Sequence, residues 1–342
     1  MKLAKLWMAA YLTLVTIQAI AQTIEVDTQQ VLREGCDKVV GINLNYIRDH
    51  DKNRARGARK IRVALQDMKP GCLRYPGGNK SNYHFWSKAP WRSPKPQAIW
   101  YGNMSKNLLN FDEYMKLVKA TGAHAYIVIA CPSVKWSEEE KEKHLNNATS
   151  WVAYAKRKRY KVKYWEIGNE NWNDRKIPID EVATRVIEFS KAMKKIDPTI
   201  KIGASGDTWD WWSKFIPQAA PHIDFVSMST YNTWNWKSYD YYYTNKLDLV
   251  GGIGVVKRIT AQLPQEHKNR IEIVVAEMNS QDFSANGWAS TNTLGHALVT
   301  FHTFGELLLE KRVAMAMLWT TRYLKEEDGS KSLFWGLGTK NE

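Results

Sequence analysis

The sequence predicts an α/β protein that folds as a (β/α)8 TIM barrel, and three observations support this prediction. Short apolar segments alternate with longer amphipathic segments from about residue 38 to the end of the 342-residue chain. The apolar segments number eight, which is the number of parallel strands that closes such a barrel. The first turn lacks the glycine-rich motif of a doubly wound open sheet, which is the structural alternative.

Eight segments have the length and apolar composition of buried strands, and they are residues 39–45, 72–76, 125–130, 163–168, 201–204, 224–229, 271–276 and 314–319. Helical patterns lie between them, at residues 58–68, 112–121, 150–157, 179–196, 250–261 and 293–309. We expect residues 23–36 to add a short strand before the barrel. No helical pattern follows the eighth strand, so we expect a barrel without its last helix, in a chain that is a fragment of a longer protein.

The N-terminus has the pattern of a secretory signal peptide. Two lysines accompany an apolar segment at residues 6–20, and the small-x-small sequence at 19–21 would leave Gln22 as the first mature residue. A membrane anchor is the alternative, but the apolar segment is short for a span. We therefore expect a signal peptide at 1–21 and one barrel domain at 22–342, in a protein that is secreted or periplasmic.

The formal net charge of +14 favours acidic partners only weakly. Much of this charge lies in the run Lys156-Arg157-Lys158-Arg159, which precedes a predicted strand and should therefore lie on the bottom face of a barrel. We interpret the run as a solvated surface and leave a sulfated polysaccharide as the alternative. Export argues against a nucleic-acid partner.

Metal and nucleotide chemistry have no support in the sequence. The chain contains no HExxH zinc motif, no P-loop and no GxGxxG motif, so we expect no cofactor and no metal ion. Cys36, Cys72 and Cys131 lack the spacing of metal ligands, and we expect them to be buried small hydrophobes and not a disulfide framework.

Two glutamates lie at the carboxyl ends of predicted strands, where barrel enzymes place their active sites. Glu170 follows the fourth strand and Glu277 follows the seventh, so the two side chains should face one another across the barrel mouth. Glycoside hydrolysis needs two carboxyls, one to protonate the leaving oxygen and one to attack the anomeric carbon, about 5 Å apart in retaining enzymes. The sequence therefore predicts a retaining glycoside hydrolase with this catalytic pair.

The surroundings of these glutamates lead to two expectations. Burial at the end of an apolar strand and a second carboxylate nearby should raise the pKa of the general acid. Glu166 lies four residues before Glu170 and should point into the barrel on the same face, at a deeper level. We expect Glu166 to form a structural ion pair, with Arg74 as the candidate partner.

The sequence Trp-Glu-Ile-Gly-Asn-Glu at 165–170, together with Glu277, resembles the signature of clan A glycoside hydrolases. The resemblance covers roughly residues 38–337. It implies that Glu170 is the acid/base and Glu277 the nucleophile. It also implies that Asn169 binds the 2-hydroxyl of the sugar.

The same resemblance implies three further contacts, and a fourth is expected from its position after a strand. Arg74 is similar to the strand-two arginine that supports the nucleophile, and Tyr231 is similar to the strand-six tyrosine that hydrogen-bonds it. Trp319 resembles the tryptophan platform under the sugar, and Asn79, in the loop after the second strand, is expected to bind substrate. Many clan members have a histidine two residues before the tyrosine, whereas this chain has Ser229, which loosens any assignment of substrate by analogy.

At the family level, residues 41–49, 73–83 and 318–322 resemble glycoside hydrolase family 86, the agarases and porphyranases. This resemblance implies endo-hydrolysis of β-galactosidic links in agarose or porphyran, and C-terminal β-sandwich domains that this chain lacks. The alternative is an α-L-arabinofuranosidase-like hydrolase, which shares the Arg-Tyr-Pro-Gly-Gly and Gly-Asn-Glu elements. A non-catalytic glycan-binding barrel is the alternative from a different functional class.

Aromatic residues are abundant in the segments that follow the predicted strands, where sugar faces could stack on them. We expect Trp172, Trp209 and Trp234 to bind substrate. Further aromatic residues in these segments are Trp86, Trp91, Trp100, Trp211, Trp212, Trp236, Tyr239, Tyr241, Tyr242 and Tyr243. Each one alone is more often explained by packing than by a sugar subsite. As a group they favour a polysaccharide or oligosaccharide substrate, bound by a monomer.

Overall fold

The computed structural model describes residues 25–53, 57, 59–98, 107–174, 176–231, 237–245, 248–280 and 294–321. The chain divides into two compact units, Met1–Glu34 and Gly35–Glu342. Residues 25–35 contain turns and bends, and a short 3-10 helix, η1 (Cys36–Lys38), follows them. The strand expected at 23–36 is therefore absent from the described part of that segment, where polar and charged residues leave no continuous apolar face.

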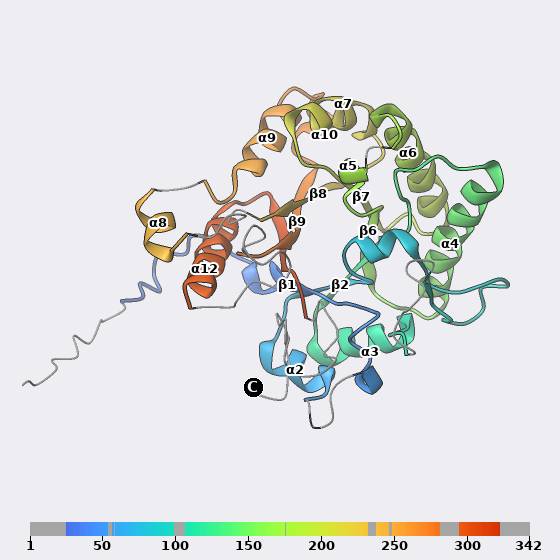
Figure 1. Ribbon diagram of the computed structural model, residues 1–342. Helices are drawn as coiled ribbons and strands as arrows, with labels where there is room; N and C mark the ends of the chain where they lie inside the picture. Colours follow the sequence, from blue (N-terminus) through green and yellow to red (C-terminus); the bar gives the residue numbers. More distant parts are fainter. Residues whose placement is uncertain are drawn as a thin grey trace, which may run out of the picture. The chain divides into compact units, whose positions relative to one another are not determined.

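Eight parallel strands of the second unit close into a barrel in the order β1-β10-β9-β8-β7-β6-β5-β2 (Figure 1). The strands are β1 (Val40–Asn43), β2 (Cys72–Tyr75), β5 (His124–Ile129), β6 (Val162–Ile167), β7 (Lys201–Ser205), β8 (Phe225–Thr230), β9 (Glu272–Met278) and β10 (Val313–Leu318). The pairing of β10 with β1 closes the ring, for example through Ala316 beside Val40. The predicted (β/α)8 barrel is confirmed, with each strand within two residues of its predicted start.

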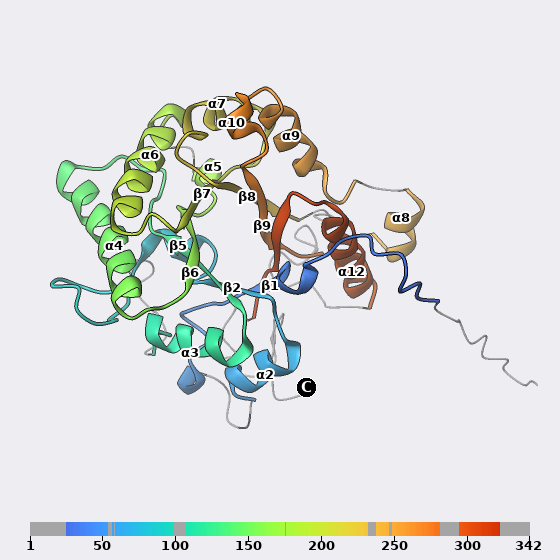
Figure 2. The same ribbon diagram turned by 180° about the vertical axis from the view of Figure 1, so that it is seen from behind.

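Helices surround the barrel on its outside, as both ribbon views show (Figures 1 and 2). Those of the outer ring are α2 (Ile61–Met68), α3 (Phe111–Thr121), α4 (Glu138–Arg157), α6 (Ile179–Ile196), α7 (Trp209–Ala219), α9 (Gly251–Thr260) and α12 (Leu294–Leu309). Shorter elements lie in the connections, namely η2 (Asp51–Asn53), η3 (Asn79–Tyr83), β3 (His84–Phe85), β4 (Gln97–Ala98), α5 (Asn171–Asp174), α8 (Tyr239–Thr244) and α10 (Gln265–Lys268). None of the described helices is long and apolar enough to cross a membrane.

Side-chain caps fix where several of these helices begin. Ser137 and Glu140 form a reciprocal capping box at the start of α4, and Thr208 accepts a hydrogen bond from the backbone of Trp211 at the start of α7. Helix α7 therefore begins four residues after β7 ends. This short connection keeps the tip of β7 close to the barrel mouth.

Large side chains fill the barrel interior. Tyr126, Tyr164 and Phe225 contact one another with ring centroids 5.6–6.2 Å apart and form one buried cluster with Cys72. Cys72 and Cys131 are buried thiols, as expected for small hydrophobes, whereas Cys36 is partly exposed at the start of η1, so the expectation is wrong for that residue. Because the interior is packed, a ligand has access to the polar side chains only at the strand ends.

Candidate active site

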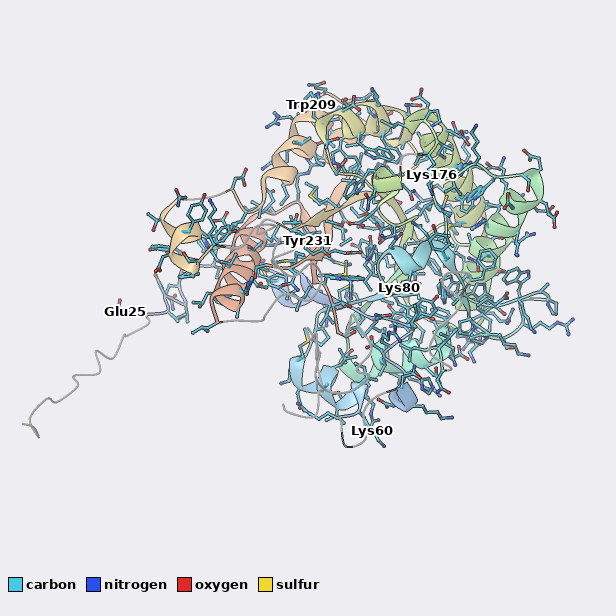
Figure 3. All side chains as sticks on the ribbon, viewed as in Figure 1. Glu25, Lys60, Lys80, Lys176, Trp209 and Tyr231 are labelled. Carbon is cyan, nitrogen blue, oxygen red and sulfur yellow. The ribbon has the colours of Figure 1, made fainter. Side chains whose placement is uncertain are left out.

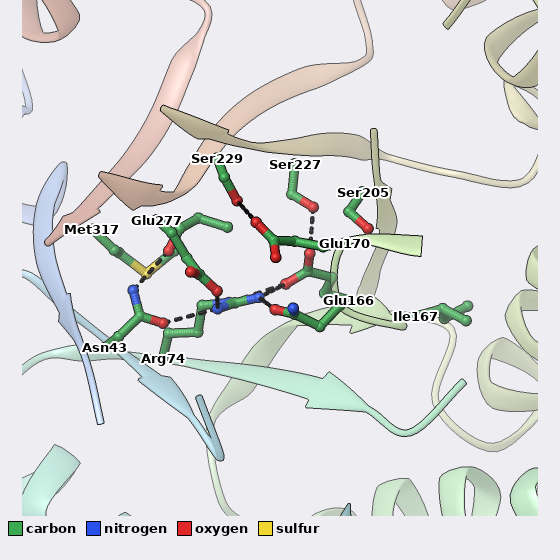
Figure 4. Close-up of polar contacts among 12 residues, drawn as sticks. Asn43, Arg74, Glu166, Ile167, Glu170, Ser205, Ser227, Ser229, Glu277 and Met317 are labelled. Atoms are coloured by element: carbon green, nitrogen blue, oxygen red, sulfur yellow. Dashed lines mark hydrogen bonds and ion pairs between the residues drawn. The ribbon is translucent and has the colours of Figure 1, made fainter. Parts of the chain in front are cut away.

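Glu170 and Glu277 lie at the carboxyl ends of β6 and β9, with β7 and β8 between these strands in the barrel order. The close-up shows both carboxyls in one polar cluster around Arg74, which comes from β2 on the other side of the interior (Figure 4). The Glu277 side chain is buried, and that of Glu170 is partly exposed. The structure thus brings the two predicted carboxyls and the predicted arginine together.

Arg74 is the centre of this cluster. Its Nη1 donates to Oε1 of Glu277 at 2.9 Å, and its Nε and Nη2 both donate to Oε2 of Glu166, at 3.1 and 2.9 Å. Its Nη2 also donates to Oδ1 of Asn169 at 2.6 Å. The ion pair predicted between Glu166 and Arg74 is confirmed, and Arg74 contacts the predicted nucleophile directly.

Two residues of the cluster were not predicted from the sequence. Asn43 at the end of β1 accepts a hydrogen bond from Arg74 at 2.9 Å and donates to the backbone oxygen of Ala276 at 2.7 Å. Ser227 of β8 donates to Glu166. Both are polar residues within short apolar strands, and this is the signal that could have identified them.

The backbone around Glu170 is held in an unusual conformation. Gly168 and Glu170 have positive φ angles of 74° and 46°, which for glutamate is a strained conformation. Asn82 of η3 binds the intervening Asn169 at both backbone groups, donating to its oxygen at 2.8 Å and accepting from its nitrogen at 2.9 Å. Asn82 was not predicted, and it fixes the segment from which Glu170 projects.

Glu170 has the electrostatic environment of a general acid. Burial, followed by the negative charge of Glu277, raises the pKa of Glu170 from 4.5 to about 8. Ser229 Oγ donates to Oε1 of Glu170 at 2.5 Å and opposes this rise. A carboxyl with this pKa is protonated at neutral pH, as proton donation to a leaving group requires.

The negative charge of Glu277 is better compensated by neighbouring groups than that of Glu170. Burial raises its pKa, while the Arg74 guanidinium and the Tyr231 hydroxyl oppose that rise. Tyr231 donates to Oε2 of Glu277 at 2.9 Å, in the contact that the resemblance implied. With a cation on one oxygen and a hydroxyl on the other, Glu277 is the better placed of the two glutamates to be ionised.

Trp319 follows β10 and has its ring against the loop after β2. A Cβ on Gly78 would lie 2.0 Å from Cη2 of Trp319, so only glycine fits there. The Nζ atom of Lys80 lies 5.4 Å from the ring centroid of Trp319, and Asn279 Nδ2 donates to the backbone oxygen of Trp319 at 2.6 Å. Trp319 is 3% exposed, so only a small part of it is open to a ligand.

The other predicted binding residues have different surroundings. Asn169 Nδ2 is a buried donor without a hydrogen-bond partner among the described residues, as a group that binds a sugar hydroxyl would be. Asn79, the first residue of η3, is exposed. Trp172 is partly buried against the main hydrophobic core. Trp234 lies outside the described residues, as do Trp100 and Trp236.

Trp209 lies outside the cluster, so its role in binding substrate stays a prediction that the cluster geometry does not support. It lies on the outer rim of the molecule, well away from Tyr231 (Figure 3). Its ring packs 5.6 Å from the guanidinium carbon of Arg258 on α9. The physical reason is the cap at Thr208, which starts α7 at Trp209 and places this side chain on the outer ring of helices.

Four of the eight other aromatic residues that the structure describes in these segments pack inside the protein. Trp86, Trp211, Trp212 and Tyr242 are buried, so they are unsuited to stack on a sugar. Tyr243 is 67% exposed, on α8. In the described ranges, no three histidine, cysteine, aspartate or glutamate side chains come together in an arrangement that could hold a metal ion.

A closed parallel barrel, with one glutamate after β6 and another at β9, is the arrangement of clan A glycoside hydrolases. The chain belongs to the alpha-L-arabinofuranosidase 1 domain family, whose model matches residues 64–247, more than half of its length. The matched region contains Arg74 and Glu170, but Glu277 lies beyond it.

Curated relatives agree with this family. Alpha-L-arabinofuranosidase C of Emericella nidulans is 28% identical over 204 residues, which are 51% of this chain and 40% of that protein. The intracellular exo-alpha-(1->5)-L-arabinofuranosidase 1 of Bacillus subtilis is 22% identical over 209 residues, or 54% of this chain and 41% of that protein. The alignments thus span about two fifths of the length of these relatives.

Solved structures show the same fold. A crystal structure of an arabinofuranosidase superposes with a TM-score of 0.66 at 25% identity, covering 86% of this chain and 66% of that chain. The thermostable GH51 alpha-L-arabinofuranosidase of Thermotoga petrophila gives a TM-score of 0.62 at 24% identity, covering 81% and 63%. These matches confirm the resemblance at the level of the clan. They do not support the agarase and porphyranase family, and they favour the arabinofuranosidase alternative.

Proposed function

We propose that this protein is a retaining glycoside hydrolase, with Glu170 as acid/base and Glu277 as nucleophile. The observation that carries the proposal is the unequal environment of the two carboxyls. Glu170 has a pKa raised to about 8, whereas Glu277 receives one charge-assisted hydrogen bond from Arg74 and a further hydrogen bond from Tyr231. This difference assigns the proton to the first carboxyl and the negative charge to the second.

The proposed reaction has two steps. Glu277 attacks the anomeric carbon and forms a glycosyl ester, while Glu170 gives its proton to the leaving oxygen as the glycosidic bond breaks. Glu170, now a carboxylate, then takes a proton from water as the water oxygen attacks the anomeric carbon and releases Glu277. Each cycle consumes one water and returns both glutamates to their starting states.

For the substrate, we propose an α-L-arabinofuranoside at the end or on a branch of a plant glycan. The support is the family match and the names of the relatives, all of which are arabinofuranosidases. Asn169 Nδ2 is the donor we assign to the 2-hydroxyl of the bound sugar, because it is buried next to Arg74 and unused by the described residues.

The test is hydrolysis by the purified protein of 4-nitrophenyl α-L-arabinofuranoside, arabinan, agarose and porphyran. We expect release of arabinose from the first two. Release of galactose-based oligosaccharides from agarose or porphyran would instead support the galactanase alternative. A protein that binds oligosaccharides and never releases a reducing end would be a glycan-binding barrel, and the hydrolase proposal would be wrong.

We also propose that the protein is exported and that cleavage after Ala21 leaves Gln22 as its first residue. Fractionation of cells that express the full chain, followed by mass spectrometry of its N-terminal peptide, tests this. An intact Met1 on cytoplasmic protein would contradict it.

A further inference from the structure

Two serines on one face of β8 bind the two glutamates of the 166–170 segment. Ser227 Oγ donates to Glu166, and Ser229 Oγ donates to Oε1 of Glu170 at 2.5 Å (Figure 4). The serines are two residues apart, so strand alternation places both side chains toward the barrel interior. The deeper serine thus serves the structural ion pair, and the one nearer the mouth serves the predicted acid/base.

We propose that Ser229 is the positioning residue that holds the Glu170 carboxyl in one orientation through both steps of the reaction. This inference rests on the proposed hydrolase function. Many clan members have a histidine at this position, so the proposed role is specific to the serine of this chain.

The chemistry of a hydroxyl suits this role. Glu170 must be protonated in the first step and ionised in the second, so its hydrogen-bonding needs reverse within each cycle. A serine hydroxyl donates to a carboxylate and accepts from a carboxylic acid, with no more than a rotation of its hydrogen. Ser229 therefore keeps its contact in both states.

Other charged groups near Glu170 cannot replace this contact. Glu277 on β9 and Glu166 on β6 repel a charge on Glu170, and Arg74 on β2 attracts it. Tyr231, which follows β8, is used by Glu277. Among the described residues, the hydrogen bond to the Glu170 carboxyl comes from Ser229, so its loss should change both the orientation and the proton affinity of Glu170.

The experiment compares Ser229→Ala with Ser190→Ala, a matched control at a buried serine of α6 that donates to the backbone oxygen of His222, outside the cluster. A hydrogen bond to a charged group contributes enough free energy that its loss in S229A should raise the pKa of Glu170 by about one pH unit. The same loss should lower kcat about tenfold. The pKa of the alkaline limb in the pH profile of kcat/KM should rise by the same amount. S190A should leave that limb and kcat in place, and Ser229→Thr should restore most of the activity.

A second readout does not need a substrate. The pKa of Glu170 is measured by NMR titration of protein labelled with [δ-13C]glutamate, with the resonance assigned through Glu170→Gln. The expected result is the same upward shift in S229A. An active wild-type protein whose S229A variant keeps both the carboxyl pKa and kcat would overturn the inference alone. A wild-type protein that hydrolyses no glycoside would overturn the hydrolase function, and the two-step role of Ser229 with it.

Discussion

At the residue scale, the two carboxyls differ in their neighbours, and this difference can be read out by chemical rescue. Glu277 receives hydrogen bonds from Arg74 and Tyr231, whereas Glu170 receives one from Ser229. Removing a nucleophile leaves space on one face of the sugar, and removing an acid/base leaves space on the other.

We predict that Glu277→Gly loses activity by several orders of magnitude and that azide restores turnover of an activated aryl glycoside with inverted product configuration. Rescue of Glu170→Ala by azide should retain configuration, because the glycosyl ester still forms. NMR of the glycosyl azide products checks both outcomes. Swapped configurations would reverse the two roles.

The raised pKa of Glu170 also predicts how stability depends on pH. The pKa is about 8 in the folded protein, above its ordinary 4.5, so folding binds a proton at this site. The stabilisation is complete below about pH 4.5 and is lost as the pH rises through about 8. Converted to free energy, this pKa shift corresponds to at most about 5 kcal/mol of folding stability.

We therefore predict that Glu170→Gln, which cannot ionise, has a higher Tm than wild type at pH 9 and a similar Tm at pH 5. Thermal unfolding at the two pH values measures the difference. Glu139→Gln, at an exposed position on α4, is the control and should shift Tm equally at both. An equal response of E170Q at pH 5 and pH 9 would show that Glu170 does not bind a proton on folding.

At the scale of elements, the loop between β2 and η3 must approach β10 closely. Gly78 has φ 58° and lies where a Cβ would overlap the Trp319 ring. Gly122, at the C-terminal end of α3, has φ 69° with nothing within 4 Å of its Cβ position. Both glycines have a positive φ, but Gly78 has ψ −161°, in a region open almost only to glycine, whereas Gly122 has ψ 13°, in the αL region.

We predict that Gly78→Ala destabilises the protein by about 2–4 kcal/mol and lowers kcat/KM, because Trp319 must move. Gly122→Ala should destabilise the protein by about 1 kcal/mol, because alanine disfavours the αL backbone conformation, and it should leave kcat/KM unchanged. Urea unfolding and steady-state kinetics measure the two effects. Equal losses in the two variants would mean that neither the contact with Trp319 nor the backbone conformation of Gly78 adds to the cost of an αL alanine.

The elements also show what the sequence could and could not predict. All eight strands were found because each is a short apolar run between polar segments. The first half of α4 was missed because residues 138–143 are charged and have no apolar stripe, although the capping box of Ser137 and Glu140 marks its start. Helix α7 was missed because Trp211 and Trp212 were interpreted as loop aromatics, whereas helical periodicity buries both.

The polar cluster depends on the register of strands far apart in the sequence, and this limited its prediction. The pairing of Glu166 with Arg74 was predicted because strand alternation places Glu166 in the barrel interior. Asn43 and Asn82 were missed because their roles depend on the distances to Ala276 and Asn169, which no local pattern reports.

At the scale of the whole molecule, Arg74 connects four parts of the barrel. From β2 it hydrogen-bonds Asn43 of β1, Glu166 of β6, Asn169 beyond β6 and Glu277 of β9. Burial disfavours its charge, but the carboxylates of Glu166 and Glu277 overcome this and raise its pKa. The same guanidinium therefore compensates part of the negative charge in the barrel interior and supports the proposed nucleophile.

Removing that guanidinium should affect stability and activity together. We predict that Arg74→Ala lowers the free energy of unfolding by about 3–5 kcal/mol, because it leaves two buried carboxylates without a cation. It should also abolish hydrolysis, since Glu277 would then take up a proton at neutral pH. Lys257→Ala, which breaks the ion pair of Lys257 with Glu310 at the surface, is the control and should cost at most about 1 kcal/mol with activity intact. Urea unfolding with parallel activity assays measures both variants. A stable R74A protein would show that the barrel does not depend on this charge.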